Sequence, residues 1–600
     1  MQGLIDLQHK KAARVAAFFM RNRLVTVGLI GLFLGWNLPN HYPPWPAYHL
    51  ELASAVALIV LFFAVAWPWT GAGNRRPISA QGTGPVVAVP LPTAARAVLL
   101  LAAVPPLQYG AGLLQFRGDA LLGSLYALGL AMSIYVGHLW ATQQGRQQAI
   151  GMLFLAIVWG AIAANALALT QWLRLDAPGW WANALIDARP FANFSQPNHY
   201  GLLMVLGLLG GAALFELGLV RSRPVLYLLA GYFGGGVVLS QSRAAALALL
   251  SLAFCWLWTR MRVASRLRLA EVLPALVLWL LLYLALESIQ TAMLLQQDQF
   301  KQPLQAGVRP WMWSLFGTAV LGRPWFGFGF NQGVEALATV ATLSAPAGVT
   351  VATTFAHNFA LDLMVWAGLP CTLLVLLALG WWLVGWLRHD ADPRTAAQRH
   401  LVFAAWLALL VQSLFEYPYA YAYFLLPAGL LAGTITCGRA PRQPPPTVAR
   451  YTCSPIALAL GVAGSVLLGA LAADYWRLED DFRMIRFVRA NYVNQPPHDY
   501  LEQPLVLDQL ALLNSTARYP VGTGMSERQL DSMRAMARRY QNTVVQLDYA
   551  RALALNGKLE LAQRELVLIR SLYDASAYRQ VEQQWQQWLA QQPGMPVPAR

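Results

Sequence analysis

This 600-residue chain has little charge, few cysteines and few acidic residues. Charged side chains make up 12% of it, against roughly 25% in an average soluble domain, which excludes a soluble globular protein. Its four cysteines, Cys255, Cys371, Cys437 and Cys453, form no CxxC pair, which excludes a disulfide framework and argues against a zinc site. The 47 glycines and 36 prolines follow no period, which excludes a collagen-like chain.

In place of charge, the chain has apolar stretches of about 16 to 22 residues, long enough to cross a hydrocarbon core of about 30 Å as helices. We predict an all-α polytopic membrane protein with about thirteen spans. The spans at 224–240 and 244–259 are short, and they are also compatible with a hairpin that does not fully cross. The predicted spans lie near 24–38, 52–69, 95–115, 120–141, 149–170, 200–219, 224–240, 244–259, 269–288, 357–387, 401–415, 421–437 and 455–473.

The 43 basic residues exceed the 28 acidic ones, and their distribution predicts orientation, because short cytoplasmic loops retain Lys and Arg. The basic loops alternate with loops that carry few cations. The N-terminus is therefore predicted to be cytoplasmic and, with an odd number of spans, the C-terminus periplasmic. Most of the positive charge is thus topological, and no nucleic-acid partner is indicated. The arginine-rich loops lie near residues 10–23, 75–76, 146, 221–223, 260–268, 388–399 and 439–450.

The predicted organisation has three parts. Residues 1–23 form a cytoplasmic basic N-terminus, read as an uncleaved anchor because no A-x-A-like cleavage site precedes the first span. Residues 24–473 form the multi-span domain, with a large periplasmic loop at 289–355. Residues 474–600 are charged and favour helix, and two apolar-periodic segments broken at Asn556-Gly557 resemble a tetratricopeptide (TPR) hairpin. Such a hairpin is more often a scaffold than an active site, but it can hold a protein acceptor.

Polar residues on the outward loops are the candidate site residues, since ionisable groups at membrane depth are costly unless paired. The segment FANFSQPNHY places Gln196, Asn198 and His199 at the start of a predicted span. The alternative is an ordinary helix cap made by Asn198.

Two outward arginines oppose the positive-inside bias. Arg243, in LSQSRAAALALL, lies between two apolar segments, where it either snorkels to the surface or binds an anion such as a lipid-linked phosphate. Arg309 precedes an amphipathic helix within the long loop. As a plain surface cation it would be mildly disfavoured by the helix dipole, so an anion-binding role is favoured.

A histidine and an acid complete the set. His357 and Asn358 begin a long apolar helix in FAHNFALDLMVWAGLP, and a helix N-terminus keeps an imidazole neutral and able to accept a proton. The alternative is a structural hydrogen bond. Glu416 and Tyr417 lie in SLFEYPYAYAYFLLP; the tyrosines also fit an aromatic belt, whereas Glu416 needs a partner such as an arginine.

Together these segments resemble the bacterial protein O-oligosaccharyltransferase family, within the superfamily of O-antigen ligases and O-antigen polymerases. The resemblance rests on the combination, in family order across about residues 190 to 430, of FANFSQPNHY, LSQSR, RPWMW, RPWFGFGFNQ, AHN and FEYPYAYAYFLLP. GWNLPNHYPPWPAYHLE and the helical C-terminal region are also similar to the protein-glycosylating branch. Two positions depart from the family pattern: Phe355 replaces a usual histidine and Trp366 an acidic residue. These departures put more weight on His357 and predict altered packing around Trp366.

The resemblance implies transfer of a preassembled glycan from undecaprenyl-pyrophosphate to a serine or threonine hydroxyl of a protein acceptor, such as a type IV pilin, at the periplasmic face of the inner membrane. His357 suits the general base, and Arg243 and Arg309 suit binding of the departing pyrophosphate. The outward loops carry few acids, so no metal and no cofactor is predicted. The predicted supporting residues for donor and acceptor are Gln196, Asn198, His199, Asn358, Glu416 and Tyr417.

Rival functions share the site or the membrane. An O-antigen ligase or polymerase would use the same residues with a sugar acceptor, but the long C-terminal region favours a protein acceptor. A lipid-linked sugar transporter would place charges at mid-depth and on both faces, whereas the notable polar residues here gather on one side. A purely structural protein is the least favoured reading.

Overall fold

The computed structural model describes residues 2–67, 86–175, 181–185, 189–263, 265–292, 308–341, 352–386, 392–436, 450–493, 504–518 and 521–592. Within them the chain is mainly helical. Two four-residue strands, β1 (Val86–Val89) and β2 (Arg450–Cys453), pair in parallel with Val86 opposite Arg450. The chain divides into two compact units, and helices α5, α13 and α16 run from one unit into the other.

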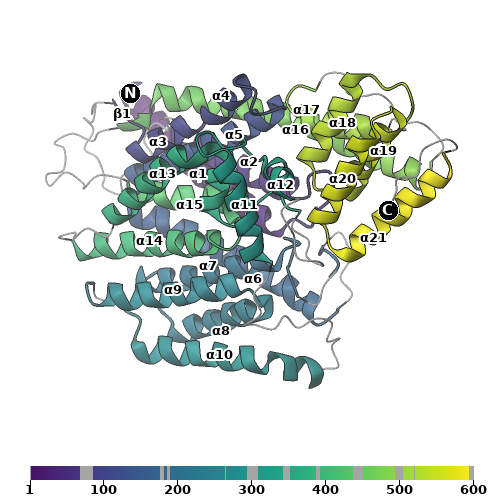
Figure 1. The fold of residues 1–600 in the computed structure, drawn as a ribbon. Coiled ribbons are helices and arrows are strands. Elements are labelled where there is room, and N and C mark those ends of the chain that lie inside the picture. The colour runs from purple at the N-terminus through teal and green to yellow at the C-terminus, as the bar shows by residue number, and fades with distance from the viewer. Residues whose placement is uncertain are drawn as a thin grey trace. The chain divides into compact units, whose positions relative to one another are not determined.

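The first unit comprises Met1–Ala102, Leu125–Pro303 and Leu379–Leu468. Its core includes Trp36, whose indole N–H donates to the carbonyl of Tyr423 at 2.7 Å. Helices α14, α9, α8 and α10 lie one beside the next (Figure 1). The helices of this unit are α1 (Gln2–Asn37), α2 (Tyr48–Ala66), α3 (Thr93–Leu101), α5 (Arg117–Gln144), α6 (Arg146–Trp172), α7 (Pro197–Glu216), α8 (Arg223–Ser240), α9 (Arg243–Arg260), α10 (Leu269–Ala292), α14 (Pro393–Ser413), the 3-10 turn η1 (Pro418–Ala420) and α15 (Ala422–Ile435).

The second unit comprises Ala103–Ser124, Leu304–Ala378 and Gly469–Arg600. A buried ion pair fixes the start of α5 in it: Nη2 and Nε of the Arg539 guanidinium donate to the Asp119 carboxylate, at 2.7 and 2.8 Å. The predicted helix break at Asn556-Gly557 is present, because α19 ends at Leu555 and α20 begins at Leu559. The TPR-like assignment and the boundary at residue 473 stay predictions. The helices are α4 (Val104–Gly110), α11 (Arg309–Gly322), α12 (Gly333–Val340), α13 (Phe359–Trp386), α16 (Pro455–Arg489), α17 (Asp508–Arg518), α18 (Glu527–Arg539), α19 (Thr543–Leu555), α20 (Leu559–Leu572) and α21 (Ala575–Ala590).

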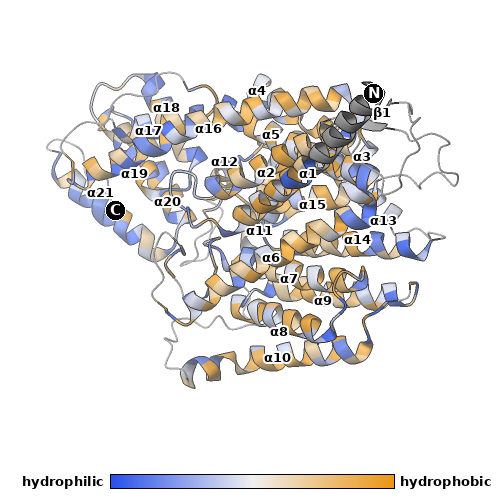
Figure 2. Ribbon diagram, turned by 180° about the vertical axis from the view of Figure 1, so that it is seen from behind, coloured by the Kyte–Doolittle hydropathy of each residue, from blue (hydrophilic) through white to orange (hydrophobic). Residues whose placement is uncertain are grey.

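Among the described residues, seven helices are long and apolar enough to cross a membrane. They are α2, α5, α6, α7, α10, α13 and α16, and Figure 2 shows hydrophobic residues along most of α10 while α21 is largely hydrophilic. The predicted class, an all-α multi-pass membrane protein, is therefore supported, while the count of thirteen spans is not confirmed.

One predicted span is not one continuous helix. The stretch at 95–115 forms two short helices, α3 and α4, because Pro105 and Pro106 have no N–H to donate to the carbonyls of Leu101 and Ala102. Pro105 and Pro106 instead occupy the first turn of α4, where an N–H has no intrahelical partner in any helix.

The predicted span at 357–387 is also not one regular helix. Gly368 breaks α13 with φ 76° and ψ 174°. Pro370 has no N–H for the carbonyl of Trp366, and the side-chain amide of Gln108 donates to that carbonyl instead, at 2.6 Å. A Cβ on Gly368 would lie 2.3 Å from the carbonyl oxygen of Trp325, so only glycine fits this close approach.

The loop with the sequence RPWFGFG completes the backbone hydrogen bonds at this break. The N–H of Leu369 donates to Pro324, and the N–H of Phe328 donates to Val365, each at 2.7 Å. Gly327 has φ 67°, and a Cβ there would lie 2.4 Å from the Val365 carbonyl. The glycines predicted to give a flexible turn therefore allow a close backbone contact with α13.

Candidate active site

Two sequence segments that are far apart in the chain meet in the first unit. The side-chain amide of Asn198 donates to the Glu416 carboxylate at 2.6 Å, and that of Gln196 donates to the Tyr417 hydroxyl at 3.2 Å. Asn198 and Gln196 lie at the start of α7, and Glu416 and Tyr417 follow α14. The FSQPNHY and FEYPY segments thus form one polar cluster around the N-terminal end of α7.

His199 lies inside this cluster and is 1% exposed. Its Nδ1 shares a hydrogen bond of 2.9 Å with the Tyr423 hydroxyl. The Tyr421 ring lies edge-on at 4.6 Å between centroids, and Phe424 lies at 5.5 Å. An imidazole so enclosed by aromatic rings is held in one orientation, which suits a positioning role better than a mobile proton carrier.

Arg189 is a member of this cluster that the sequence reasoning did not single out. Its guanidinium donates twice to the carbonyl of Ser240, at 2.7 and 3.0 Å, and once to the side-chain oxygen of Asn198 at 3.2 Å. Asn198 therefore links Arg189 to Glu416 through two hydrogen bonds. The signal in the sequence was only that Arg189 is one of the few outward arginines.

Arg243 is the exposed first residue of α9 in the same unit. The preceding turn is tightly built: Gln241 has φ 47°, and the Ser242 hydroxyl accepts from the N–H of Ala245 at 3.2 Å. The same LSQSR segment supplies the Ser240 carbonyl that binds Arg189. The turn therefore binds Arg189 through the Ser240 carbonyl and places Arg243 at the start of α9.

The second group of predicted residues lies in the second unit. His357 precedes α13 with φ 56°, a left-handed conformation that costs a non-glycine residue roughly 1–2 kcal/mol and marks functional sites. Its Nδ1 lies 3.1 Å from the carbonyl oxygen of Phe355. Because a carbonyl can only accept, Nδ1 carries the proton, and the neutral ring presents Nε2 as its acceptor nitrogen.

Two residues that the sequence reasoning missed hold the peptide next to His357. The Asp362 carboxylate, which is fully buried, accepts from the N–H of Ala356 at 2.8 Å. The Trp313 indole donates to the Ala356 carbonyl, also at 2.8 Å. Both backbone groups of Ala356 are thus fixed from different helices, which holds His357 in its strained conformation.

Burial lowers the pKa of the His357 imidazole, the hydrogen bond to Phe355 partly opposes this, and the positive charge of Arg309 adds a smaller lowering, so that the pKa is about 4. Arg309 is half-buried and is the first residue of α11. The structure therefore places the predicted base and one predicted phosphate-binding arginine in the same electrostatic environment, with His357 neutral at pH 7.

Asn358 has a structural task in addition to its predicted one. Its side-chain oxygen accepts from the N–H groups of Ala360 and Leu361, at 3.1 and 3.2 Å, and so caps α13. Phe355 and Trp366, the two departures from the family pattern, contact each other edge-on at 6.1 Å between ring centroids. The two departures thus place two aromatic rings in contact, and the altered packing around Trp366 stays a prediction.

A metal site was not predicted. Within the described ranges, no group of three or more His, Cys, Asp or Glu side chains is arranged to hold a metal ion. Metal independence stays a prediction that requires activity measurements.

Comparisons with known proteins agree with the motifs. Residues 228–376 match the family described as O-Antigen ligase, and residues 400–587 match the family described as Virulence factor membrane-bound polymerase, C-terminal. A general O-oligosaccharyltransferase of Acinetobacter baylyi is 26% identical over 577 residues, which cover 92% of this chain and 93% of that protein. A ComP-specific O-oligosaccharyltransferase of the same organism is 26% identical over 275 residues, 45% of this chain and 48% of that protein. The resemblance to the protein O-oligosaccharyltransferase family, within the superfamily of O-antigen ligases, is therefore confirmed.

Proposed function

We propose that this protein transfers a preassembled glycan from undecaprenyl-pyrophosphate to a serine or threonine hydroxyl of a protein acceptor. The similarity to O-oligosaccharyltransferases over nearly the whole chain supports a glycosyltransferase that acts on protein. The single structural observation that carries the mechanism is the neutral His357, which presents Nε2 as an acceptor near Arg309.

In the proposed reaction, His357 takes the proton of the acceptor hydroxyl while its oxygen attacks the anomeric carbon of the glycan. The bond from that carbon to the pyrophosphate oxygen breaks, and the sugar configuration inverts. The pyrophosphate leaves with its negative charge, so cations must stabilise it. Arg309 and Arg243 are assigned this role because one guanidinium group can donate two parallel hydrogen bonds to the oxygens of a phosphate.

A base with a pKa of about 4 is weak in the free protein. A pyrophosphate bound to Arg309 would offset the smaller of the two contributions that lower this pKa, so donor binding would strengthen the base in part while burial continues to lower the pKa.

The cluster of the first unit is assigned to positioning of donor and acceptor. The Arg189–Asn198–Glu416 chain of hydrogen bonds and the Gln196–Tyr417 contact give a fixed set of polar groups. The acceptor is proposed to be a pilin-like protein, and the reaction needs no metal ion. The N-terminus is assigned to the cytoplasm and the C-terminal region to the periplasm, which reporter fusions at each end would test.

The test is a reconstituted assay with purified protein, an undecaprenyl-pyrophosphate glycan and a candidate pilin. His357→Ala should abolish glycan transfer. The control variant is His138→Ala, which should keep glycan transfer; His138 is a half-buried histidine on α5 that shares a hydrogen bond with Thr436. Unchanged transfer by His357→Ala would eliminate the proposed base.

Arg309→Lys and Arg243→Lys test the second role. Each change keeps the charge but loses paired hydrogen bonding, so each should reduce kcat at least tenfold. Full activity of both variants would refute leaving-group stabilisation by these residues. Transfer to lipid A-core with none to protein would make the chain an O-antigen ligase.

A further inference from the structure

A cavity of about 180 Å³ lies inside the first unit, away from all residues assigned above. Helices α7, α8, α9, α10 and α14 line it. Its walls are apolar along most of their length, with Leu226, Leu249, Trp256 and Trp279 among them. The glycan-transfer chemistry uses none of these side chains, so the cavity needs another explanation.

Helix α10 forms a thin wall of this cavity. Only 11% of its apolar window is buried, and Leu278, Leu281 and Leu284 on its outer side are 50%, 57% and 68% exposed. Trp279 anchors the helix on α8, where Gly234 permits the contact: a Cβ there would lie 1.9 Å from the indole nitrogen. In a bilayer, the outer face of α10 would contact lipid chains.

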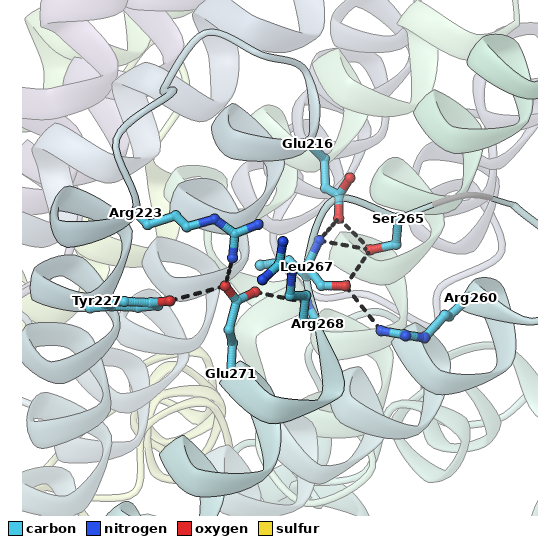
Figure 3. A network of polar contacts seen from close by, with 8 residues as sticks. All are labelled: Glu216, Arg223, Tyr227, Arg260, Ser265, Leu267, Arg268 and Glu271. Atoms are coloured by element: carbon cyan, nitrogen blue, oxygen red, sulfur yellow. Dashed lines mark hydrogen bonds and ion pairs between the residues drawn. The ribbon is translucent and has the colours of Figure 1, made fainter.

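One end of the cavity is polar, and its two carboxylates are already engaged (Figure 3). Glu216 accepts from the Ser265 hydroxyl and from the N–H groups of residues 266 and 267. Glu271 accepts from the Arg223 guanidinium, from the Tyr227 hydroxyl at 3.0 Å and from the N–H of residue 268 at 2.7 Å. Both acids therefore build the walls of this end.

Five arginines, Arg223, Arg260, Arg262, Arg266 and Arg268, lie in the segments next to this end, whose lining includes Glu216 and Glu271 but none of these arginines. Arg223 pairs with Glu271. Among the described residues, no carboxylate pairs with the guanidinium groups of Arg260, Arg262, Arg266 or Arg268. Arg260 donates to the carbonyl of Leu267 at 3.1 Å, and Arg266 donates to that of Phe215. This end of the cavity therefore has an excess of positive charge.

Aromatic rings support these cations. The Arg262 guanidinium lies 4.0 Å from the Trp258 ring centroid, and Trp258 packs edge-on against His400 at 5.8 Å. Arg260 lies 5.5 Å from the Trp256 ring, and both Trp256 and His400 line the cavity. Tryptophan and arginine together are typical of the level where lipid headgroups meet hydrocarbon.

We propose that this cavity binds an anionic phospholipid, with part of one acyl chain among α7–α10 and α14 and the phosphate against Arg260 and Arg262. The apolar walls would not hold a free phosphate, and a zwitterionic lipid would not use the excess of charge. The arginines lie in the loops at 221–223 and 260–268, which the charge distribution assigns to the cytoplasmic side. The glycan donor is assigned to the opposite side, so this lipid is distinct from the donor. Basic pockets between membrane helices are known to select anionic headgroups.

The test compares phosphatidylglycerol with phosphatidylcholine on the purified full-length protein, by native mass spectrometry and by the thermal unfolding midpoint. Arg260→Gln with Arg262→Gln should weaken phosphatidylglycerol binding about 30-fold, since each arginine contributes about 1 kcal/mol near an anionic lipid and 1.4 kcal/mol is tenfold. Both side chains are exposed, so the variant should fold. The matched control is Arg23→Gln, which changes an exposed arginine on α1. This variant should bind phosphatidylglycerol as the wild type does.

The apolar half of the site has its own variant. Ala253→Trp fills the cavity from α9 and should remove the phosphatidylglycerol-specific rise in unfolding midpoint. Leu250→Trp, at a 58% exposed position on the same helix, should keep it. Equal binding by wild type and the double arginine variant would overturn the proposal. So would an equal response to inorganic phosphate or phosphatidylcholine, or a response to undecaprenyl phosphate alone, which would give the cavity to the donor.

Discussion

Asp362 offers the sharpest test of how His357 is held. Its buried carboxylate accepts from the N–H of Ala356. Asp362→Ala removes a hydrogen bond to a charged group and leaves that N–H without this acceptor, at a cost of about 1.5–3 kcal/mol. The left-handed conformation of His357 costs about 1–2 kcal/mol. The loss is therefore as large as the strain that the bond helps to hold, or larger, and the peptide should relax.

If the active conformation is destabilised by about 2 kcal/mol, kcat should fall about 30-fold at 25 °C. The assay is glycan transfer from the lipid-pyrophosphate donor to the protein acceptor, with kcat and KM measured separately. Asp362→Asn keeps an oxygen that can accept from Ala356 and should retain activity within about threefold.

A second readout separates positioning from general damage. A relaxed loop admits water to His357, so its pKa should move from about 4 back toward 6.5. Transfer by Asp362→Ala should then decline between about pH 7 and pH 5, a range in which the wild type is insensitive at this residue. Wild-type kcat in the alanine variant, or an unchanged pH profile with reduced kcat, would refute the reasoning.

Other predictions follow from the same contacts. In the wild type, protonation of His357 should not change kcat/KM between about pH 8 and pH 5. Below about pH 4, kcat/KM should fall tenfold for each pH unit because His357 becomes protonated. The pKa of His357 in the folded protein, about 4, lies below its ordinary value of 6.5, so the unfolded chain binds more protons between these pH values. The contribution of His357 to stability is therefore complete above pH 6.5 and is lost as the pH falls toward 4, which thermal unfolding at several pH values would reveal. Arg539→Ala should lower the free energy of unfolding by about 3–5 kcal/mol because it leaves Asp119 buried without this cation, whereas replacing both residues by leucine should cost far less; chemical denaturation of the three proteins checks this. Activity should survive EDTA unchanged, and a loss that Mg²⁺ or Mn²⁺ restores would contradict metal independence.

Hydrophobic length predicted many helices well, because a long apolar segment has few other ways to satisfy its backbone in a membrane. The segments at 120–141, 149–170 and 200–219 became α5, α6 and α7 with ends within a few residues. Hydropathy failed where backbone chemistry interrupts an apolar run. Pro105 and Pro106 divide one predicted span, and Gly368 with Pro370 breaks another, although neither lowers the hydropathy enough to be seen as a boundary.

The site shows a similar division. Asn198, His199, His357 and Glu416 were accessible from sequence because polar residues in apolar surroundings are conspicuous. Asp362, Trp313 and Arg189 were not, because their roles depend on partners elsewhere in the fold. Trp313 is 43 residues from Ala356, and Arg189 is 51 from Ser240. Tertiary hydrogen bonds of this kind leave no local pattern in the chain.

The break at Gly368 gives α13 a mechanical property that its hydropathy hides. The backbone hydrogen bonds of α13 are interrupted at Gly368. A tilt of the segment from Leu369 onward is therefore not passed to the segment before Gly368 as it would be along an unbroken helix. The two sides of the break are instead tied to one loop, since the Val365 carbonyl before it accepts from Phe328 and the N–H of Leu369 after it donates to Pro324. The RPWFGFG loop therefore holds the angle between the two parts of α13, and we expect substitutions in that loop to change the helix that begins beside the proposed base.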